Sequence, residues 1–133
     1  MGMLKQDGIR SVGLTMAFLA ANLTIAADYT WLGIASGNWN ETDANWSGAG
    51  TVWTNGAANN ATFGAASTKS IVADAITLNN LAFTADGYTI GGGPFQMYGG
   101  FTVGSGLSAA LTASVSNNVG ICEKKGTGTL VLD

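Results

Sequence analysis

Four side chains between residues 39 and 46 are of the types that bind carbohydrates. Glu41 and Asp43 are the only carboxylates that lie two residues apart in the chain, and Trp39 and Trp46 flank them. An aromatic ring packs against the apolar face of a sugar, and a carboxylate accepts hydrogen bonds from sugar hydroxyls. One interpretation of this stretch is therefore a ligand site made of Trp39, Trp46, Glu41 and Asp43.

Other catalytic and metal sites lack the residues that they need. The chain has no His and one Cys, which excludes a Ser-His-Asp triad and a zinc site. Glycosidases need two facing carboxylates, but Asp74 and Asp86 are separated by less than one unit of the repeat described below, so stacking of units does not bring them together. Glu41 and Asp43 would share one face of a strand, although such residues usually lie in solvated loops. We therefore expect a non-enzymatic protein with no metal and no cofactor.

Composition and charge narrow the class of protein. Only 10% of the residues are charged and 47% are hydrophobic, with 20 Gly and 1 Pro, which disfavours disorder and favours a β-rich fold. Beyond residue 27 there are three Lys and seven carboxylates, a net charge of −4, and there is no Arg. A negative net charge with so few basic side chains argues against binding to nucleic acid or to an anionic membrane surface.

Residues 1–27 have the pattern of a secretory signal peptide. Lys5 and Arg10 precede an apolar stretch, SVGLTMAFLAANLTIAA, which closes on small residues at Ala26 and Ala27. Polar residues interrupt the stretch, and it is shorter than the roughly 20 apolar residues that span a membrane. We expect a helical signal peptide that is cleaved near Asp28. The alternatives are an uncleaved N-terminal anchor and a buried helix.

A repeat with a period of about 20 runs through the rest of the chain. Pairs of Asn or Gly recur, and apolar residues stand at the first and third positions after each pair. The pairs are Asn59-Asn60, Asn79-Asn80, Gly99-Gly100 and Asn117-Asn118, and the apolar residues are Ala61 and Phe63, Leu81 and Phe83, Phe101 and Val103, and Val119 and Ile121. Repetition at a period of this length is typical of solenoid proteins.

The alternation around Asn79-Asn80 predicts a corner at that pair. The apolar residues before it, Ile76 and Leu78, are even-numbered, and those after it, Leu81 and Phe83, are odd-numbered. A continuous flat strand would turn one set outward, because its side chains alternate between two faces. A corner of Asn or Gly keeps both sets inward. Strands and corners stacked about 4.8 Å apart make a β-solenoid, in which Asn side chains form ladders.

The Trp-rich segment, residues 28–56, has a second interpretation as a cap. Its tryptophans follow one another at intervals of 8, 7 and 7, which suits neither one helix nor one strand; they are Trp31, Trp39, Trp46 and Trp53. The first turn of a solenoid has an apolar end and unpaired backbone, and rings that each bury roughly 150–250 Å² would cover both. We favour the cap, and the ligand site stays open as the alternative.

The order of these segments resembles that of bacterial proteins with autotransporter-associated β-strand repeats. The resemblance rests on GNW and ANW in the Trp-rich segment and on KKGTGTLVLD at residues 124–133. In that family a K-x-G-x-G-T-L-x-L-x-G unit recurs along a right-handed parallel β-helix. The matching positions here are Lys124, Gly126, Gly128, Thr129, Leu130 and Leu132. The resemblance implies a long passenger that is secreted or exposed at the cell surface, of which this chain is expected to be the N-terminal portion.

These observations predict an all-β protein with a short right-handed parallel β-helix. Residues 1–27 form the signal peptide, 28–56 the Trp-rich cap and 57–133 the turns of the β-helix. The expected function is a structural or adhesive segment of a secreted or outer-membrane-associated cell-surface protein. The alternatives are a carbohydrate-binding module and a fragment of a β-helical polysaccharide-active enzyme.

Two kinds of partner are expected. One is a surface glycan, or another component of a host or of the cell surface. The other is a second copy of the chain, bound through an open C-terminal turn or through Cys122. Alternation from Val119 and Ile121 predicts that the Cys122 side chain points outward. A leftover thiol in a secreted chain can pair between molecules.

Overall fold

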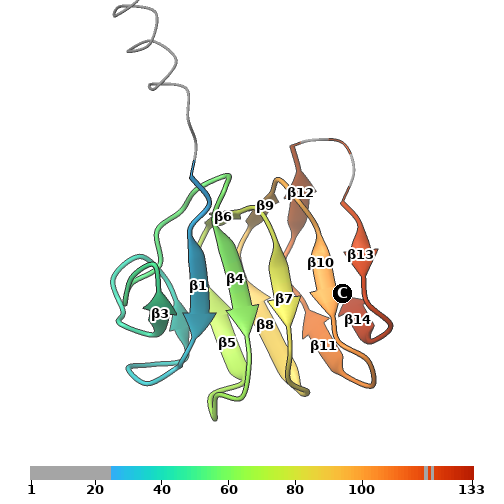
Figure 1. Ribbon diagram of the computed structural model, residues 1–133, viewed down its shortest axis with the longest axis horizontal. Coiled ribbons are helices and arrows are strands. Elements are labelled where there is room, and N and C mark those ends of the chain that lie inside the picture. Colours follow the sequence, from blue (N-terminus) through green and yellow to red (C-terminus); the bar gives the residue numbers. More distant parts are fainter. Residues whose placement is uncertain (1–24, 119, 121) are drawn as a thin grey trace, which may run out of the picture.

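The computed structural model describes residues 25–118, 120 and 122–133, and the regular structure within them is all β-strand (Figure 1). Sheet 1 is six-stranded: β13 (Lys124–Lys125), β10 (Phe101–Val103), β7 (Leu81–Phe83), β4 (Asn60–Phe63), β1 (Asp28–Trp31) and β3 (Trp46–Gly48). Sheet 2 is five-stranded: β14 (Thr129–Leu132), β11 (Ser108–Leu111), β8 (Tyr88–Gly92), β5 (Ser70–Ala73) and β2 (Asn38–Trp39). Sheet 3 is three-stranded: β12 (Val115–Asn117), β9 (Phe95–Met97) and β6 (Ile76–Leu78). Nearly all of the expected signal peptide lies outside the described residues.

Neighbouring strands from successive turns are parallel, which confirms the predicted β-solenoid. In sheet 1, Ala61 pairs with Leu81 and Leu81 pairs with Phe101, as the repeat predicts. In sheet 3, Ile76 pairs with Phe95. The interval between these partners is one residue shorter than the interval between Leu81 and Phe101 in sheet 1. The chain passes through sheets 1, 2 and 3 in turn and returns to sheet 1 beside the strand that it left (Figure 1).

The corner at Asn79-Asn80 lies where the alternation predicts it. β6 ends at Leu78 and β7 begins at Leu81, and Ile76, Leu78, Leu81 and Phe83 are each at most 1% exposed. The change from even to odd positions therefore turns the backbone while both apolar sets stay inside. Alternate residues of the other strands also point inward and make up the core along the axis: Phe63, Ile71, Tyr88, Ile90, Phe95, Met97, Phe101, Val103 and Leu111.

The predicted Asn ladder forms along the corner between sheets 3 and 1. Asn60 donates from Nδ2 to the Asp28 carboxylate at 2.8 Å, and its Oδ1 accepts from the side-chain amides of Asn79 and Asn80 at 3.1 and 3.3 Å. In the next turn the backbone N–H of Gly100 donates to Asn80 Oδ1 at 3.0 Å. Each corner thus satisfies polar groups of the corner beside it.

The register predicted for the fourth repeat unit is wrong. The sequence pattern matches Asn117-Asn118 to Gly99-Gly100, which would place Val119 beside Phe101. In the structure Asn117 pairs with Met97, and Phe101 pairs with Lys124, which lies further along the chain than Val119. The connection from β12 to β13 has six residues, whereas that from β9 to β10 has three. The strand that pairs with β10 is therefore β13 and not one that begins at Val119. Val119 and Ile121 themselves lie outside the described residues.

Candidate functional site

The four tryptophans pack together inside the N-terminal end of the solenoid. Each of them is at most 1% exposed. The Trp39 ring lies 5.2 Å from that of Trp46 and 5.1 Å from that of Trp53, centroid to centroid, and 5.3 Å from the ring of Phe63 in the next turn. The cluster is therefore continuous with the apolar core and covers its first layer. This arrangement is the cap that the sequence favours.

Strand β3 closes the N-terminal edge of sheet 1. It pairs antiparallel with β1, with Tyr29 opposite Gly48 and Trp31 opposite Trp46. The outer side of β3 is occupied in turn, because the backbone N–H of Trp46 donates to the carbonyl of Thr51 at 3.0 Å. The chain therefore folds back across its own first strand, and a parallel strand cannot continue sheet 1 in this direction.

Side-chain amides close the corresponding edges of the other two sheets. Asn45 is fully buried and donates from Nδ2 to the carbonyl of Asn38 in β2 at 2.9 Å. Asn55 Oδ1 accepts from the backbone N–H of Thr77 in β6 at 2.8 Å, and its Nδ2 donates to the carbonyl of Ala75 at 3.1 Å. Asn45, Asn55 and β3 are features that the sequence interpretation missed. In the sequence, the only indication of these features is the position of Asn45 and Asn55 within the Trp-rich segment.

The structure does not support a sugar-stacking surface at Trp39 and Trp46. Both rings are buried, at 0% and 1% exposure, so neither presents a face to a ligand. Their indole N–H groups have no hydrogen-bond partner, and the two rings contact each other and Trp53. Burial among aromatic rings is what a cap requires, and it removes these two residues from the candidate ligand site.

Glu41 and Asp43 are engaged in hydrogen bonds that hold the cap together. Glu41 is exposed, and its Oε1 accepts from the backbone N–H of Asn55 at 2.7 Å. Asp43 accepts from the Ser36 hydroxyl at 2.6 Å, and its backbone carbonyl accepts from the N–H of Asn45 at 2.9 Å. The Ser36 hydrogen bond is the main cause that lowers the pKa of Asp43, and bonds from neighbouring polar side chains add to it. Both carboxylates are thus placed to fix loops of the cap.

The C-terminal end differs from the N-terminal end in having open strand edges. Among the described residues, no strand pairs with the outer edges of β12, β13 or β14. Leu132 occupies an inward position above Leu111, yet it is 58% exposed while Leu111 is fully buried. Val131, on the outward face of β14, is 50% exposed. This end therefore leaves unpaired backbone and apolar side chains in solvent, and it is our candidate functional site.

Glycines of the Gly-Thr-Gly stretch bring β13 and β14 close to the preceding turn. Gly126 has φ of +77°, and a Cβ placed on it would overlap with the carbonyl oxygen of Val103. A Cβ on Gly128 would overlap in the same way with the carbonyl oxygen of Gly104. Only glycine fits such contacts. This motif is therefore a corner that stacks tightly on the corner before it.

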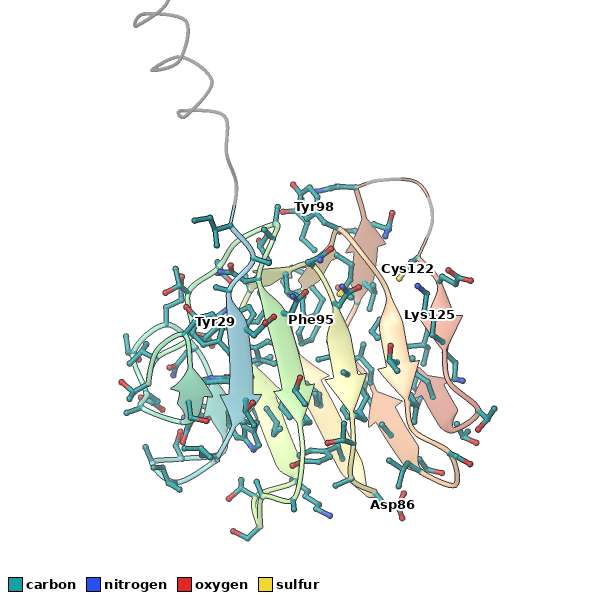
Figure 2. All side chains as sticks on the ribbon, in the orientation of Figure 1. Tyr29, Asp86, Phe95, Tyr98, Cys122 and Lys125 are labelled. Atoms are coloured by element: carbon teal, nitrogen blue, oxygen red, sulfur yellow. The ribbon has the colours of Figure 1, made fainter. Side chains whose placement is uncertain are left out.

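Cys122 and Lys125 mark the start of this last turn (Figure 2). Cys122 is exposed, as the sequence predicts, and it is a free cysteine. Partial burial of its sulfur raises the pKa of the thiol, and a weaker hydrogen bond with the Asn117 side chain opposes the shift. A raised pKa keeps most of the thiol protonated at neutral pH, so it is not activated as a nucleophile.

The described residues contain no group of three or more His, Cys, Asp or Glu side chains that could hold a metal ion. They also contain no helix with the length and hydrophobicity needed to cross a bilayer. No family model, no curated protein and no solved structure matches this chain.

Proposed function

We propose that this chain is a non-enzymatic structural or adhesive segment of a secreted or cell-surface protein built from β-strand repeats. The observation that carries the proposal is the difference between the two ends of the solenoid. β3, Asn45 and Asn55 occupy the N-terminal edges, whereas β12, β13 and β14 have outer edges that pair with no strand among the described residues. Turns of a solenoid contact only their neighbours, so an uncapped end accepts further turns.

The geometry of the last turn supports a place among autotransporter-associated β-strand repeat proteins. The K-x-G-x-G-T-L-x-L stretch comprises β13, the glycine corner and β14, and β14 pairs in parallel with β11 of the turn before it. A unit with these glycines stacks on the preceding turn through backbone contacts. Repetition of the unit would lengthen the same column, as a stalk or passenger requires.

The outer face of sheet 1 supports an adhesive role. Its outward positions lie in register from turn to turn and form one row: Thr30, Thr62, Ala82, Thr102 and Lys125. Thr30 and Thr62 are neighbours at the strand spacing of about 4.8 Å, and Thr102 and Lys125 are neighbours beyond Ala82, so four of the five positions offer a hydrogen-bonding group. The partner that we propose for this face is a surface glycan or another cell-surface component.

An added turn tests whether the C-terminal end serves for extension. A copy of residues 113–133 placed after Asp133 has the length of the last turn, which is the interval from Ala109 to its partner Leu130. We expect the copied strand to stack on β14 and to raise the midpoint of thermal unfolding by at least about 4 °C, since nearest-neighbour contacts stabilise solenoids. Circular dichroism against temperature measures the change.

The matched control carries the same added segment with its residues in scrambled order. This control keeps the composition and loses the alternation and the glycine corner, so its unfolding midpoint should equal that of the original chain. Equal midpoints for the ordered and the scrambled copies would contradict the proposal, because an end built for extension has to stabilise the next turn.

A further inference from the structure

Asn55 and Gly56 lie in the connection from β3 to β4, where the chain passes the N-terminal edge of β6 (Figure 1). Asn55 is the only Asn in the sequence that is followed by Gly. Asn is a thermolabile residue, and a following Gly favours loss of its side-chain amide. The reason is that Gly has no side chain, so its backbone nitrogen can reach the Asn side chain with little steric hindrance. This pair is therefore a reactive sequence placed at a closed edge.

The atoms that would react are the ones that close the edge of β6. Asn55 Oδ1 accepts from the backbone N–H of Thr77 at 2.8 Å, and the backbone N–H of Gly56 donates to the Thr77 carbonyl at 3.0 Å. Asn55 Nδ2 donates to the carbonyl of Ala75 at 3.1 Å, and the backbone N–H of Asn55 donates to Glu41 Oε1 at 2.7 Å. Attack of the Gly56 nitrogen on Cγ of Asn55 requires the bonds to Thr77 and Ala75 to break. Closure and reaction therefore exclude each other.

We propose that Asn55 is a deamidation site that the closed cap protects and that reacts when the edge of β6 opens. In the open state the nitrogen of Gly56 loses its proton and bonds to Cγ of Asn55. The bond from Cγ to Nδ2 breaks, and Nδ2 leaves as ammonia, so a succinimide ring forms. Water then opens the ring at either carbonyl and gives aspartate or isoaspartate at this position. Water is consumed and ammonia is released in equal amounts, and nothing is oxidised or reduced.

Neither product restores the closed edge. Aspartate has no amide donor, so a carboxylate oxygen would face the carbonyl oxygen of Ala75, and its negative charge would lie beside Glu41. Isoaspartate adds a methylene group to the backbone before Gly56 and so shifts the Gly56 N–H away from the Thr77 carbonyl. Each product leaves a backbone group beside β6 without its partner, which is costly at a partly buried position. A brief opening of the cap thereby becomes permanent.

Peptide mapping by mass spectrometry compares the reaction in the folded and the unfolded protein. Protein purified from cells that express the full sequence is incubated at neutral pH, with and without guanidinium chloride. In the denaturant Asn55 should convert steadily, while Asn80 should keep its amide because the side chain of Leu81 obstructs attack. In the folded protein the conversion of Asn55 should be at least about tenfold slower, since it waits for local opening. Equal rates in the two states, or no conversion in the denaturant, would overturn the proposal.

Two carboxylates offer a matched test of local opening. Glu41 accepts from the backbone N–H of Asn55, and Asp86 accepts from that of Ser108; both bonds measure 2.7 Å and both carboxylates are exposed. Glu41→Ala removes a bond that holds the reactive pair, so it should speed the deamidation of the folded protein at least about threefold. Asp86→Ala acts in a later turn and should leave the rate unchanged. The same acceleration in both variants would show that the reaction follows general unfolding, which contradicts a protecting cap.

Substitution tests what the product does to the cap. Asn55→Asp carries the aspartate product and should lower the midpoint of thermal unfolding by at least about 4 °C, because the Ala75 carbonyl loses its donor. Asn118→Asp is the control, since it makes the same change on an exposed side chain and should shift the midpoint by less than about 1 °C. Equal midpoints for the two variants would mean that deamidation does not hinder closure. None of these results bears on the stability gained from an added turn, so this proposal and the proposed function can fail separately.

Discussion

At Asn45, a fully buried amide makes four hydrogen bonds within the cap. Its Oδ1 accepts from the backbone N–H groups of Ala35 and Ser36 at 2.8 and 3.0 Å. Its Nδ2 donates to the Ser36 hydroxyl and to the carbonyl of Asn38, both at 2.9 Å. Every donor and acceptor of the amide is thereby used, so its burial leaves no polar group without a partner. One residue holds the loop before β2 and closes the edge of that strand.

Leu81 provides the test of the core at the scale of a residue. It is fully buried, and its partners in the neighbouring turns are Ala61 and Phe101. Leu81→Asp places an unpaired charge inside the column, and we expect it to lower the free energy of unfolding by more than about 4 kcal/mol. Urea denaturation followed by fluorescence measures the loss.

Ala82→Asp is the control for this substitution. Ala82 is the next residue in β7 and points outward between Thr62 and Thr102. A carboxylate there stays in solvent, so the unfolding free energy should change by less than about 0.5 kcal/mol. A mild effect of Leu81→Asp that matches the effect of Ala82→Asp would remove Leu81 from the core.

At the scale of the element, β3 depends on a glycine. Gly48 has φ of +100°, and a Cβ placed on it would overlap with the carbonyl oxygen of Asp28. This close approach lets the end of β3 pack against the start of β1, where Gly48 pairs with Tyr29. A side chain at this position would push the two strands apart.

The substitution Gly48→Ala tests the closing strand. Strained backbone and the clash with Asp28 should lower the free energy of unfolding by about 1–3 kcal/mol. Gly50→Ala is the control, because φ at Gly50 is not positive and its nearest contact would be 3.6 Å away, an ordinary packing distance. Thermal unfolding of both variants measures the difference. Equal unfolding midpoints for Gly48→Ala and Gly50→Ala would mean that β3 does not help to close the N-terminal edge of sheet 1.

At the scale of the whole molecule, the solenoid has a direction. Aromatic rings, the Asn45 and Asn55 amides and an antiparallel strand occupy the N-terminal end, while the outer edges at the other end pair with no strand among the described residues. Further turns can therefore stack only at the C-terminal end. This polarity is what we expect of a segment that starts a longer column.

Export belongs to the molecule as a whole and is predicted from residues 1–27. In a bacterial expression host we expect the chain to leave the cytoplasm and to lose its N-terminal segment near Ala27, because a basic start followed by an apolar stretch and small residues directs cleavage. Cell fractionation and the intact mass of the product measure both. Leu19→Asp interrupts the apolar stretch and should keep the chain full-length in the cytoplasm.

The conservative substitution Asn22→Ser is the control for export, since it leaves the apolar stretch and its charge unchanged. A product of full-length mass outside the cytoplasm would show that the segment is retained as an anchor. Cytoplasmic location of the original chain would contradict secretion and with it the proposed passenger role.

Much of the fold could be predicted because it depends on neighbouring residues. The alternation on either side of Asn79-Asn80 specifies two strands and the corner between them, and the period of the repeat brings Leu81 beside Phe101. The register after β12 could not be predicted, because the length of a connection does not appear in an alternating pattern. The candidate ligand site at Trp39 and Trp46 had the right residue types, but only packing revealed that these rings are buried.

The sequence by itself determined the all-β class, the repeating corners and the inward column, since each follows from side-chain alternation within a few residues. Only the tertiary structure decided which edges of the sheets are closed. Closure depends on contacts between residues far apart in the chain, as when Asn55 in the cap bonds to Thr77 in β6. Such contacts depend on how the turns stack, and no local pattern specifies them.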